Sequence, residues 1–132
     1  MVLPHFKVLS NELSTPIILH CPADSERKPA KDFASLTETN ISYFVGLSAS
    51  EAYPNSILSG DRTLMTNGVP LRNQFLDINQ GLVLDFAPGS HRTGRNFVLG
   101  DGSVQQFSQA RLANHLKTLM ESTNGVERWV FP

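Results

Sequence analysis

The residues best suited to do chemistry in this 132-residue chain are His91 and Asp101, which could serve as a general base and its orienting partner. The extended stretch 96–100 alone spans about 16 Å at ~3.3 Å per residue, and His91 lies beyond it. The two side chains can therefore meet only if the chain folds back at Thr93-Gly94. The spacing favours structural roles instead: Asp101 as a turn residue and His91 as a hydrogen-bonding clasp for a loop.

Metal ligands are scattered along the sequence. The four histidines are widely separated, at His5, His20, His91 and His115. His20 and Cys21 are neighbours, and neighbouring side chains of a strand point to opposite faces. Oxygen atoms of Asp101 and Asn96 could suit a calcium ion, but the sequence contains no recognised calcium-binding loop. The sequence thus predicts no metal site and no cofactor.

Nucleophilic side chains lack the surroundings that activate them. There is no G-x-S-x-G motif, and Ser103 falls inside a predicted hairpin. Cys21 precedes Pro22 and has no cationic neighbour in the sequence, which favours a structural thiol. Tyr43 and Phe44 could present an aromatic surface, but core packing of at least one is the simpler expectation. We therefore expect no catalytic residue and no enzymatic activity.

A β-hairpin is the clearest local structure in the sequence. Two extended segments, residues 95–100 and 103–107, flank Asp101-Gly102, and Asp-Gly suits a type I′ turn because both of its central residues need positive φ. A two-residue loop would place Leu99 opposite Val104. A three-residue loop with a bulge at its glycine would shift that pairing by one residue.

The segment before residue 41 is predicted to hold little regular structure. Apolar residues at helical spacing indicate a short amphipathic helix over residues 4–13, ended before Pro16. A short strand is expected over residues 17–21. Residues 23–40 are polar and are predicted to form a surface loop with one helical turn at residues 33–36.

Further strands are expected between this segment and the hairpin, and a helix after it. The strands are predicted at residues 41–47, 56–61, 62–66 and 82–86, with a tight turn at Asn67-Gly68. Ser108 suits the N-cap of a helix over residues 109–123 that Asn124-Gly125 would end. One apolar stripe follows its helical spacing: Leu112, Ala113, Leu116, Leu119 and Met120. Trp129 in the tail is expected to pack back on the body.

Strands in runs with helices at the two ends predict an α+β fold, with a mainly antiparallel sheet, a short N-terminal helix and an amphipathic C-terminal helix packed on it. Residues 1–132 have the length of a single domain. The formal net charge is −1 and no basic patch occurs, so a nucleic-acid partner is not expected. The single cysteine excludes an internal disulfide, and no apolar run approaches the ~18 residues of a membrane span.

Three stretches in order resemble a bacterial family of prepilin-like proteins. His91, nine residues and then Asp101-Gly102 match that family's H-X9-DG signature, and Asn96 and Ser103 also match its pattern. Residues 18–24 (ILHCPAD) and 41–62 (ISYFVGLSASEAYPNSILSGDR) are similar to the body of the same family. The resemblance therefore covers most of the chain.

The resemblance implies the head domain of a type II secretion or type IV pilus-like pseudopilin. Such a head is non-enzymatic, lies in the periplasm or cell envelope, and contacts other pseudopilin subunits or secretion components. Relatives carry a basic leader and a long hydrophobic helix that anchors them in the inner membrane, and nothing like it occurs in this sequence. We expect this chain to be soluble as given, and exposure of an apolar sheet face could drive homodimerisation.

Two other functions remain open from the sequence. A soluble extracytoplasmic module that binds a glycan or a peptide could reuse the same head fold, and an envelope hydrolase is the third candidate. Resemblance of fold cannot rank these alternatives, because function depends on sites.

Overall fold

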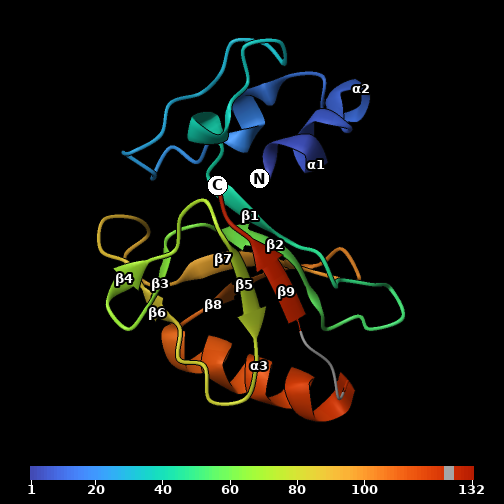
Figure 1. The fold of residues 1–132 in the computed structure, drawn as a ribbon, viewed down its shortest axis with the longest axis vertical. Helices are drawn as coiled ribbons and strands as arrows, with labels where there is room; N and C mark the ends of the chain where they lie inside the picture. Colours follow the sequence, from blue (N-terminus) through green and yellow to red (C-terminus); the bar gives the residue numbers. More distant parts are fainter. Residues whose placement is uncertain (124–126) are drawn as a thin grey trace.

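A six-stranded antiparallel sheet forms the centre of the computed structural model, which describes residues 1–123 and 127–132 (Figure 1). Its strands run in the order β5-β9-β1-β2-β7-β8. Their bounds are β1 (Tyr43–Gly46), β2 (Ile57–Asp61), β5 (Phe75–Ile78), β7 (Arg95–Leu99), β8 (Val104–Phe107) and β9 (Glu127–Val130). A smaller three-stranded sheet contains β4 (Val69–Pro70), β3 (Leu64–Thr66) and β6 (Asp85–Phe86). The predicted α+β class with mainly antiparallel strands is confirmed.

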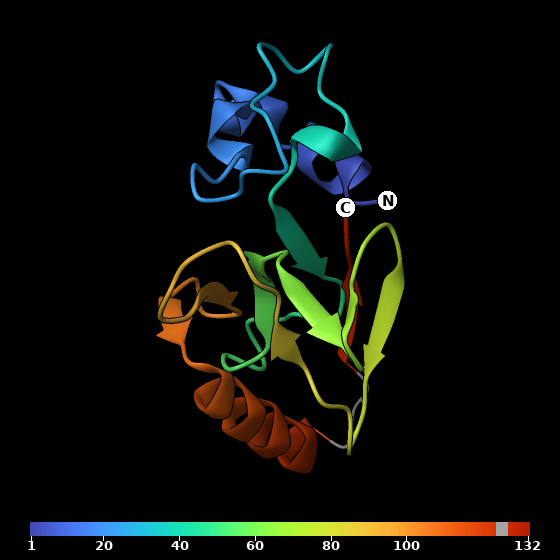
Figure 2. The ribbon, with the colours of Figure 1, turned by 90° about the vertical axis from the view of Figure 1, so that its left-hand side faces the viewer.

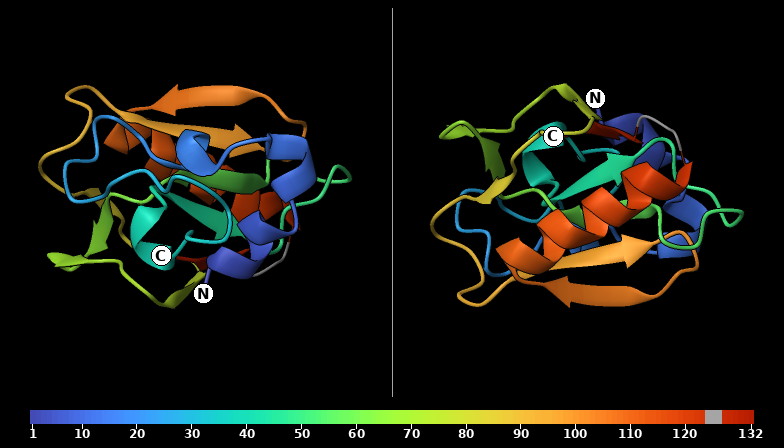
Figure 3. Two further views of the ribbon diagram at one scale, coloured as in Figure 1. Left: turned by 90° about the horizontal axis from the view of Figure 1, so that it is seen from above. Right: turned by 90° about the horizontal axis from the view of Figure 1, so that it is seen from below.

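The C-terminal helix α3 (Gln109–Thr123) runs across the strands on one face of the large sheet (Figure 3). It begins where predicted, because the Ser108 hydroxyl accepts a hydrogen bond from the Arg111 N–H at 3.2 Å. Four members of the predicted stripe are buried against the sheet: Leu112, Leu116, Leu119 and Met120. Ala113 is exposed, so its place in the stripe was wrong. The predicted helix end at Asn124-Gly125 lies outside the described residues.

Aromatic rings fill the space between α3 and the sheet. Phe44 stacks on Trp129 with ring centroids 4.5 Å apart, and Phe97 stacks on Phe107 at 5.4 Å. Trp129 is fully buried, which confirms that the tail packs back on the body. Gly60 lies between two of these rings, and a Cβ atom there would stand 2.7 Å from Phe97 and 2.8 Å from Phe44. The absence of a side chain at residue 60 is what lets both rings approach the β2 backbone.

Residues 1–42 form a separate layer, called the N-terminal cap below, at the end of the molecule opposite α3 (Figure 2). It contains α1 (Leu3–Lys7), α2 (Ser10–Leu13) and two 3-10 helices, η1 (Pro16–Leu19) and η2 (Glu38–Asn40). A second apolar cluster joins the cap to the sheet through Val45 and Val130. The cap is therefore packed against β1 and β9.

The structure corrects three predictions within the cap. The expected helix over residues 4–13 is broken into α1 and α2. The expected strand over residues 17–21 is wrong: Pro16 occupies the first turn of η1, where its fixed φ suits a helix start, and the Thr15 hydroxyl accepts from the Ile17 N–H. The helical turn expected at residues 33–36 is also wrong, because the turn forms later, at η2.

The hairpin β7–β8 is present, but its pairing differs from the first expectation. Val98 lies opposite Val104, so Leu99 does not. Three residues form the loop, with Gly102 at φ 83°, which is the bulged alternative. The loop docks on the segment before β2, since the Gly100 and Asp101 N–H groups donate to the carbonyls of Ser56 and Pro54. This docking selects the three-residue loop.

The remaining strand predictions hold with shorter bounds. β1, β2 and β3 lie inside their predicted segments, whereas only Asp85–Phe86 of residues 82–86 forms a strand. The turn at Asn67-Gly68 is confirmed, with φ of 50° and 75°. Among the described residues, no helix combines the length and apolar character that a membrane crossing requires.

Candidate functional site

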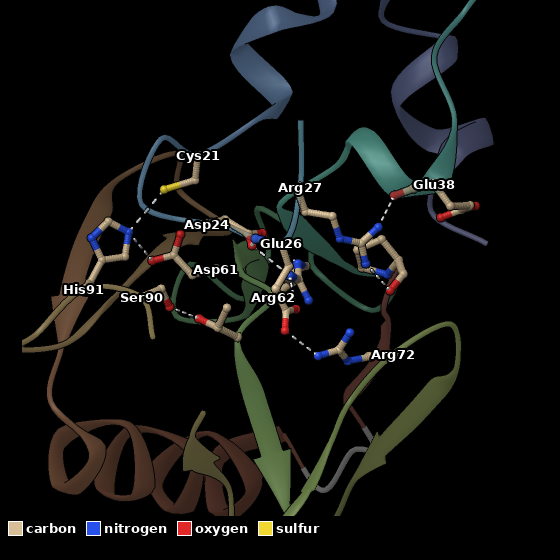
Figure 4. Close-up of polar contacts among 12 residues, drawn as sticks. Cys21, Asp24, Glu26, Arg27, Glu38, Asp61, Arg62, Arg72, Ser90 and His91 are labelled. Carbon is tan, nitrogen blue, oxygen red and sulfur yellow. Dashed lines mark hydrogen bonds and ion pairs between the residues drawn. The ribbon is translucent and has the colours of Figure 1, made fainter. Parts of the chain in front are cut away.

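Three segments that are distant in sequence bring Cys21, Asp61 and His91 together at the junction of cap and sheet (Figure 4). Cys21 follows η1, Asp61 is the last residue of β2, and His91 lies in the loop before β7. His91 Nε2 lies 3.3 Å from Cys21 Sγ and 3.6 Å from Asp61 Oδ2. We call these three residues the Cys-Asp-His cluster.

Main-chain hydrogen bonds fix the positions of Cys21 and Asp61. The Ser42 N–H donates to the Leu19 carbonyl and the Arg62 N–H donates to the Ser42 carbonyl, so the chain after η1 lies against the end of β2. Cys21 and Asp61 are consequently buried, with exposed fractions of 8% and 4%. The cluster is thus built into the contact between cap and sheet.

The Asp61 carboxylate is stabilised by groups from the hairpin side. Burial raises the pKa of Asp61, although the Asn96 N–H, which donates to Oδ2 at 2.7 Å, and the nearby His91 act in the opposite direction. A buried carboxylate without a charged partner is costly. This carboxylate is held by a main-chain N–H and an imidazole.

The geometry of the cluster differs from that of a catalytic triad. In a triad the imidazole uses one nitrogen toward the nucleophile and the other toward the carboxylate. Here the thiol and the carboxylate both lie against Nε2 of His91. A single nitrogen cannot take a proton from Cys21 while its own proton is held by Asp61. The arrangement suits a hydrogen-bonded clasp or a bound cation better than an activated thiol.

The loop that carries His91 is held in place by Arg95, the first residue of β7. Its guanidinium is buried and donates to the carbonyls of Ala87, His91 and Gly94 and to the hydroxyl of Thr63. The same group lies over the Phe86 ring, 4.8 Å from its centroid. This role of Arg95 was not predicted, because residue spacing in the sequence does not indicate that a single arginine in a strand is buried.

A second polar network lies beside the cluster. The Arg62 guanidinium donates to both carboxylate oxygens of Asp24 and to Glu26, and Arg72 donates to Glu26. Burial alone would raise the pKa of Asp24, but its hydrogen bonds with Arg62 and the charge of Arg62 outweigh burial and lower it. Asp24 is therefore paired with Arg62, although it lines the same pocket as the cluster and its charge raises the pKa of Asp61.

The Ser42 hydroxyl differs from the other buried polar groups at this junction in its hydrogen bonding. Its side chain is 2% exposed, and its hydroxyl is the buried side-chain polar atom without a hydrogen-bond partner among the described residues. It lies close enough to Asp24 to contribute to the lowered pKa, but without standard hydrogen-bond geometry. Ser42, Asp24 and the cluster line the same small pocket, which leaves no room for a water molecule.

His91 and Asp101 do not form a shared site. His91 lies in the cluster before β7, whereas Asp101 lies in the loop after it, exposed, where its carboxylate accepts from the Ser103 N–H at 2.8 Å. Gly102 supplies the positive φ of the turn. Asn96 reaches the cluster through its main-chain N–H. The residues of the H-X9-DG pattern, with Asn96 and Ser103, thus lie at or near the two ends of β7. The turn role predicted for Asp101 agrees with these contacts.

Other candidates from the sequence lie elsewhere or in the core. His115 Nε2 donates to the Asn55 carbonyl at 2.8 Å, and its ring packs on Phe107. His5 and His20 are not part of the cluster. Phe44 is a core residue, and Tyr43 is half-buried, where burial and the nearby Cys21 and Asp61 raise its pKa to about 12.

The Cys-Asp-His cluster could not be predicted from the sequence because Asp61 is separated from its partners by 40 and 30 residues. A search for metal sites among the histidines and cysteines does not consider Asp61, a carboxylate at the end of a strand. One signal was present: each of the three stretches that resemble the prepilin-like family contains one member of the cluster.

Comparison of the chain with protein-family models, with curated proteins and with solved structures finds no match.

Proposed function

We propose that this chain is the non-enzymatic globular head of a pseudopilin-like protein of the bacterial cell envelope, acting through contacts with other subunits of a type II secretion or pilus-like assembly. One observation carries the proposal. The three stretches on which the family resemblance depends, residues 18–24, 41–62 and 91–103, meet in space at the junction of cap and sheet.

Every stretch supplies a contact to the others. The first stretch contributes Cys21 and Asp24, and the second contributes Asp61 and Arg62. The third contributes His91 and the main-chain N–H of Asn96. These contacts support an architectural role for the three stretches. Contacts of this kind form without any substrate.

The Asp-Gly turn supports the same interpretation. Asp101 satisfies a main-chain N–H within its own turn, and the loop docks through main-chain donors on Pro54 and Ser56. The Cys21 thiol and the Asp61 carboxylate both lie against Nε2 of His91, an arrangement that does not suit nucleophilic catalysis. These contacts favour the head domain over the envelope hydrolase.

Exposed apolar side chains offer surfaces for subunit contacts. Within the cap, Ile17 and Ile18 are 54% and 52% exposed, and Val8 is also exposed. Apolar side chains that face solvent are common singly, but adjacent ones favour association. Contact with a neighbouring subunit, or with a second copy of this chain, would cover them.

The native protein in its source cells provides the test. An antibody raised against this chain would be used to follow the native product through cell fractionation and in a strain lacking prepilin peptidase. We expect the product in the inner-membrane fraction, heavier than 14.6 kDa, with a further increase in mass when the peptidase is absent. Protease added to spheroplasts should degrade the head, because the head faces the periplasm.

Two outcomes would contradict the proposal. A native product of 14.6 kDa that stays in the soluble fraction and is indifferent to the peptidase would favour the glycan- or peptide-binding module. Hydrolysis of an envelope substrate that is lost in both C21A and H91A, with the fold of both variants intact, would favour the hydrolase.

A further inference from the structure

We propose that the Cys-Asp-His cluster is a zinc site, in which Cys21 Sγ, Asp61 Oδ2 and His91 Nε2 are the protein ligands. The inference depends on the geometry at the junction of cap and sheet and is independent of the pseudopilin proposal. A bound zinc ion would link the cap, β2 and the loop before β7.

The distances fit a tetrahedral ion. One ligand atom from each residue lies within 4.8 Å of the other two, with 3.3 Å between sulfur and nitrogen and 3.6 Å between nitrogen and oxygen. Zinc bonds of ~2.3 Å to sulfur and ~2.0–2.2 Å to nitrogen and oxygen separate neighbouring ligands by roughly 3.3–3.6 Å in a tetrahedron. Two of the three separations therefore match those that zinc requires, and the sulfur-to-oxygen separation is within 4.8 Å.

The donor set selects the type of ion. A thiolate together with an imidazole suits zinc, whereas calcium and magnesium prefer oxygen ligands throughout. Both Cys21 and Asp61 approach the same nitrogen of His91, where a single proton can satisfy only part of the contact. An ion at the centre of the three atoms would satisfy all of them at once.

The charges of the site also favour a divalent cation. Bound to an ion, a Cys21 thiolate and the Asp61 carboxylate would place two negative charges in a buried position, and Zn²⁺ would neutralise both. The neighbouring cations donate their hydrogen bonds to other groups, although the charge of Arg95 also acts on Asp61. Arg62 donates to Asp24 and Glu26, and Arg95 donates to loop carbonyls and a hydroxyl.

The hydrogen bonding of Asp61 supports a ligand at this position. The Asn96 N–H donates to Asp61 Oδ2 and orients the carboxylate, as outer hydrogen bonds do in metal sites. The Ser42 hydroxyl, in the same pocket, has no partner of standard hydrogen-bond geometry among the described residues, but it lies close to Asp24.

His91 is the most exposed member of the cluster. It is 25% exposed and lies on the boundary of a surface groove that also includes Pro88 and Arg92. Three protein ligands leave the fourth position of a tetrahedral ion to water. In this proposal the fourth ligand would lie on the groove side of His91.

Cobalt and zinc titrations of the reduced chain provide the test. Co²⁺ should give the intense visible bands of a tetrahedral ion and a sulfur-to-metal charge-transfer band, which must come from Cys21 because the chain has no other cysteine. Zn²⁺ should displace Co²⁺ at one ion per chain and raise the unfolding temperature. C21S, D61N and H91Q should each weaken Zn²⁺ binding at least tenfold, whereas H5Q, at an exposed histidine, should leave it unchanged.

The spectrum of the unaltered chain decides the matter even if a variant fails to fold. Absence of the charge-transfer band at saturating Co²⁺ would overturn the proposal and leave the cluster as a hydrogen-bonded clasp. Equal Zn²⁺ affinity in the folded C21S, D61N or H91Q variant and in the unaltered chain would also overturn it, because the ion would then be bound elsewhere.

Discussion

The side chains of Asp24 and Arg62 form a buried two-point ion pair: Nε and a terminal nitrogen of the guanidinium donate to separate carboxylate oxygens at 2.7 and 2.8 Å. The two residues are 38 positions apart: Asp24 belongs to the cap, and Arg62 directly follows β2. Parallel hydrogen bonds of this kind are among the stronger polar contacts in proteins. The pair therefore contributes directly to the docking of the cap.

Removing the Asp24 charge should destabilise the fold. D24N leaves a buried guanidinium with only Glu26 as a charged partner, and breaking a buried pair costs about 3–5 kcal/mol. Urea unfolding followed by Trp129 fluorescence would measure the loss. E51Q, at an exposed carboxylate, is the control and should change stability by less than about 0.5 kcal/mol. A loss of similar size in both variants would contradict a special role for the pair.

The contribution of this pair should depend on pH in acid. The pKa of Asp24 is lower in the folded chain than in the unfolded chain, so the stabilisation is complete above the ordinary aspartate pKa of about 3.9. It is lost as the pH falls from there through the folded pKa. The difference in unfolding temperature between the unaltered chain and D24N should be largest near neutral pH and shrink below about pH 4. A difference that grows in acid would refute this assignment.

Glu127 should have the opposite dependence on pH. Burial raises its pKa, although the Trp129 indole donates to Oε2 at 3.0 Å. A raised pKa means stabilisation that is complete below the unfolded value, about 4.3, and lost as the pH rises through the folded value. E127Q keeps an acceptor without the charge, so it should be more stable than the unaltered chain at pH 7 and not below pH 4. E121Q on α3 should show no such gain.

A methyl group at residue 60 should disturb the aromatic core. The Cβ of G60A would lie within 3 Å of Phe97 and Phe44, closer than packed atoms approach. Overpacking of this kind costs about 1–3 kcal/mol, measurable by calorimetry. Combining G60A with F97L removes one of the two rings, so the double variant should lose less than the sum of the single losses. Strict additivity would argue against contact at this position.

Self-association should depend on the exposed isoleucines of the cap. We expect the unaltered chain to form dimers at high concentration, and I17S/I18S should shift sedimentation toward the monomer. V104S, at an apolar side chain exposed on β8, is the matched control and should leave the mass unchanged. A monomer at every concentration would contradict the expected dimerisation.

Local patterns were enough to predict the elements whose structure is decided locally. Helix α3 has its N-cap at Ser108 and its buried stripe at 3.6-residue spacing, and the turn at Asn67-Gly68 has the positive φ values that its residues favour. Pairing within the hairpin was harder. Its three-residue loop is selected by main-chain bonds to Ser56 and Pro54, which lie more than forty residues earlier.

The cap and the candidate site depended on contacts that no local pattern contains. Ile17 and Ile18 are typical strand residues, yet they pair with no strand of the described residues, and Pro16 starts a helical turn instead. Cys21 was treated as an isolated thiol because its surroundings in sequence contain no cation. Its neighbours in the structure are Asp61, at the end of β2, and His91, in the loop before β7.

Asp61 Oδ2 is approached from two sides, by the Asn96 N–H of β7 and by His91, which also contacts Cys21 of the cap. Cap, β2 and β7 therefore share one junction, and the cap cannot detach without disturbing the middle of the sheet. We infer that the two layers open as one cooperative unit. Amide hydrogen exchange should then be nearly as slow at Ser42, in the cap, as at Phe44 in β1.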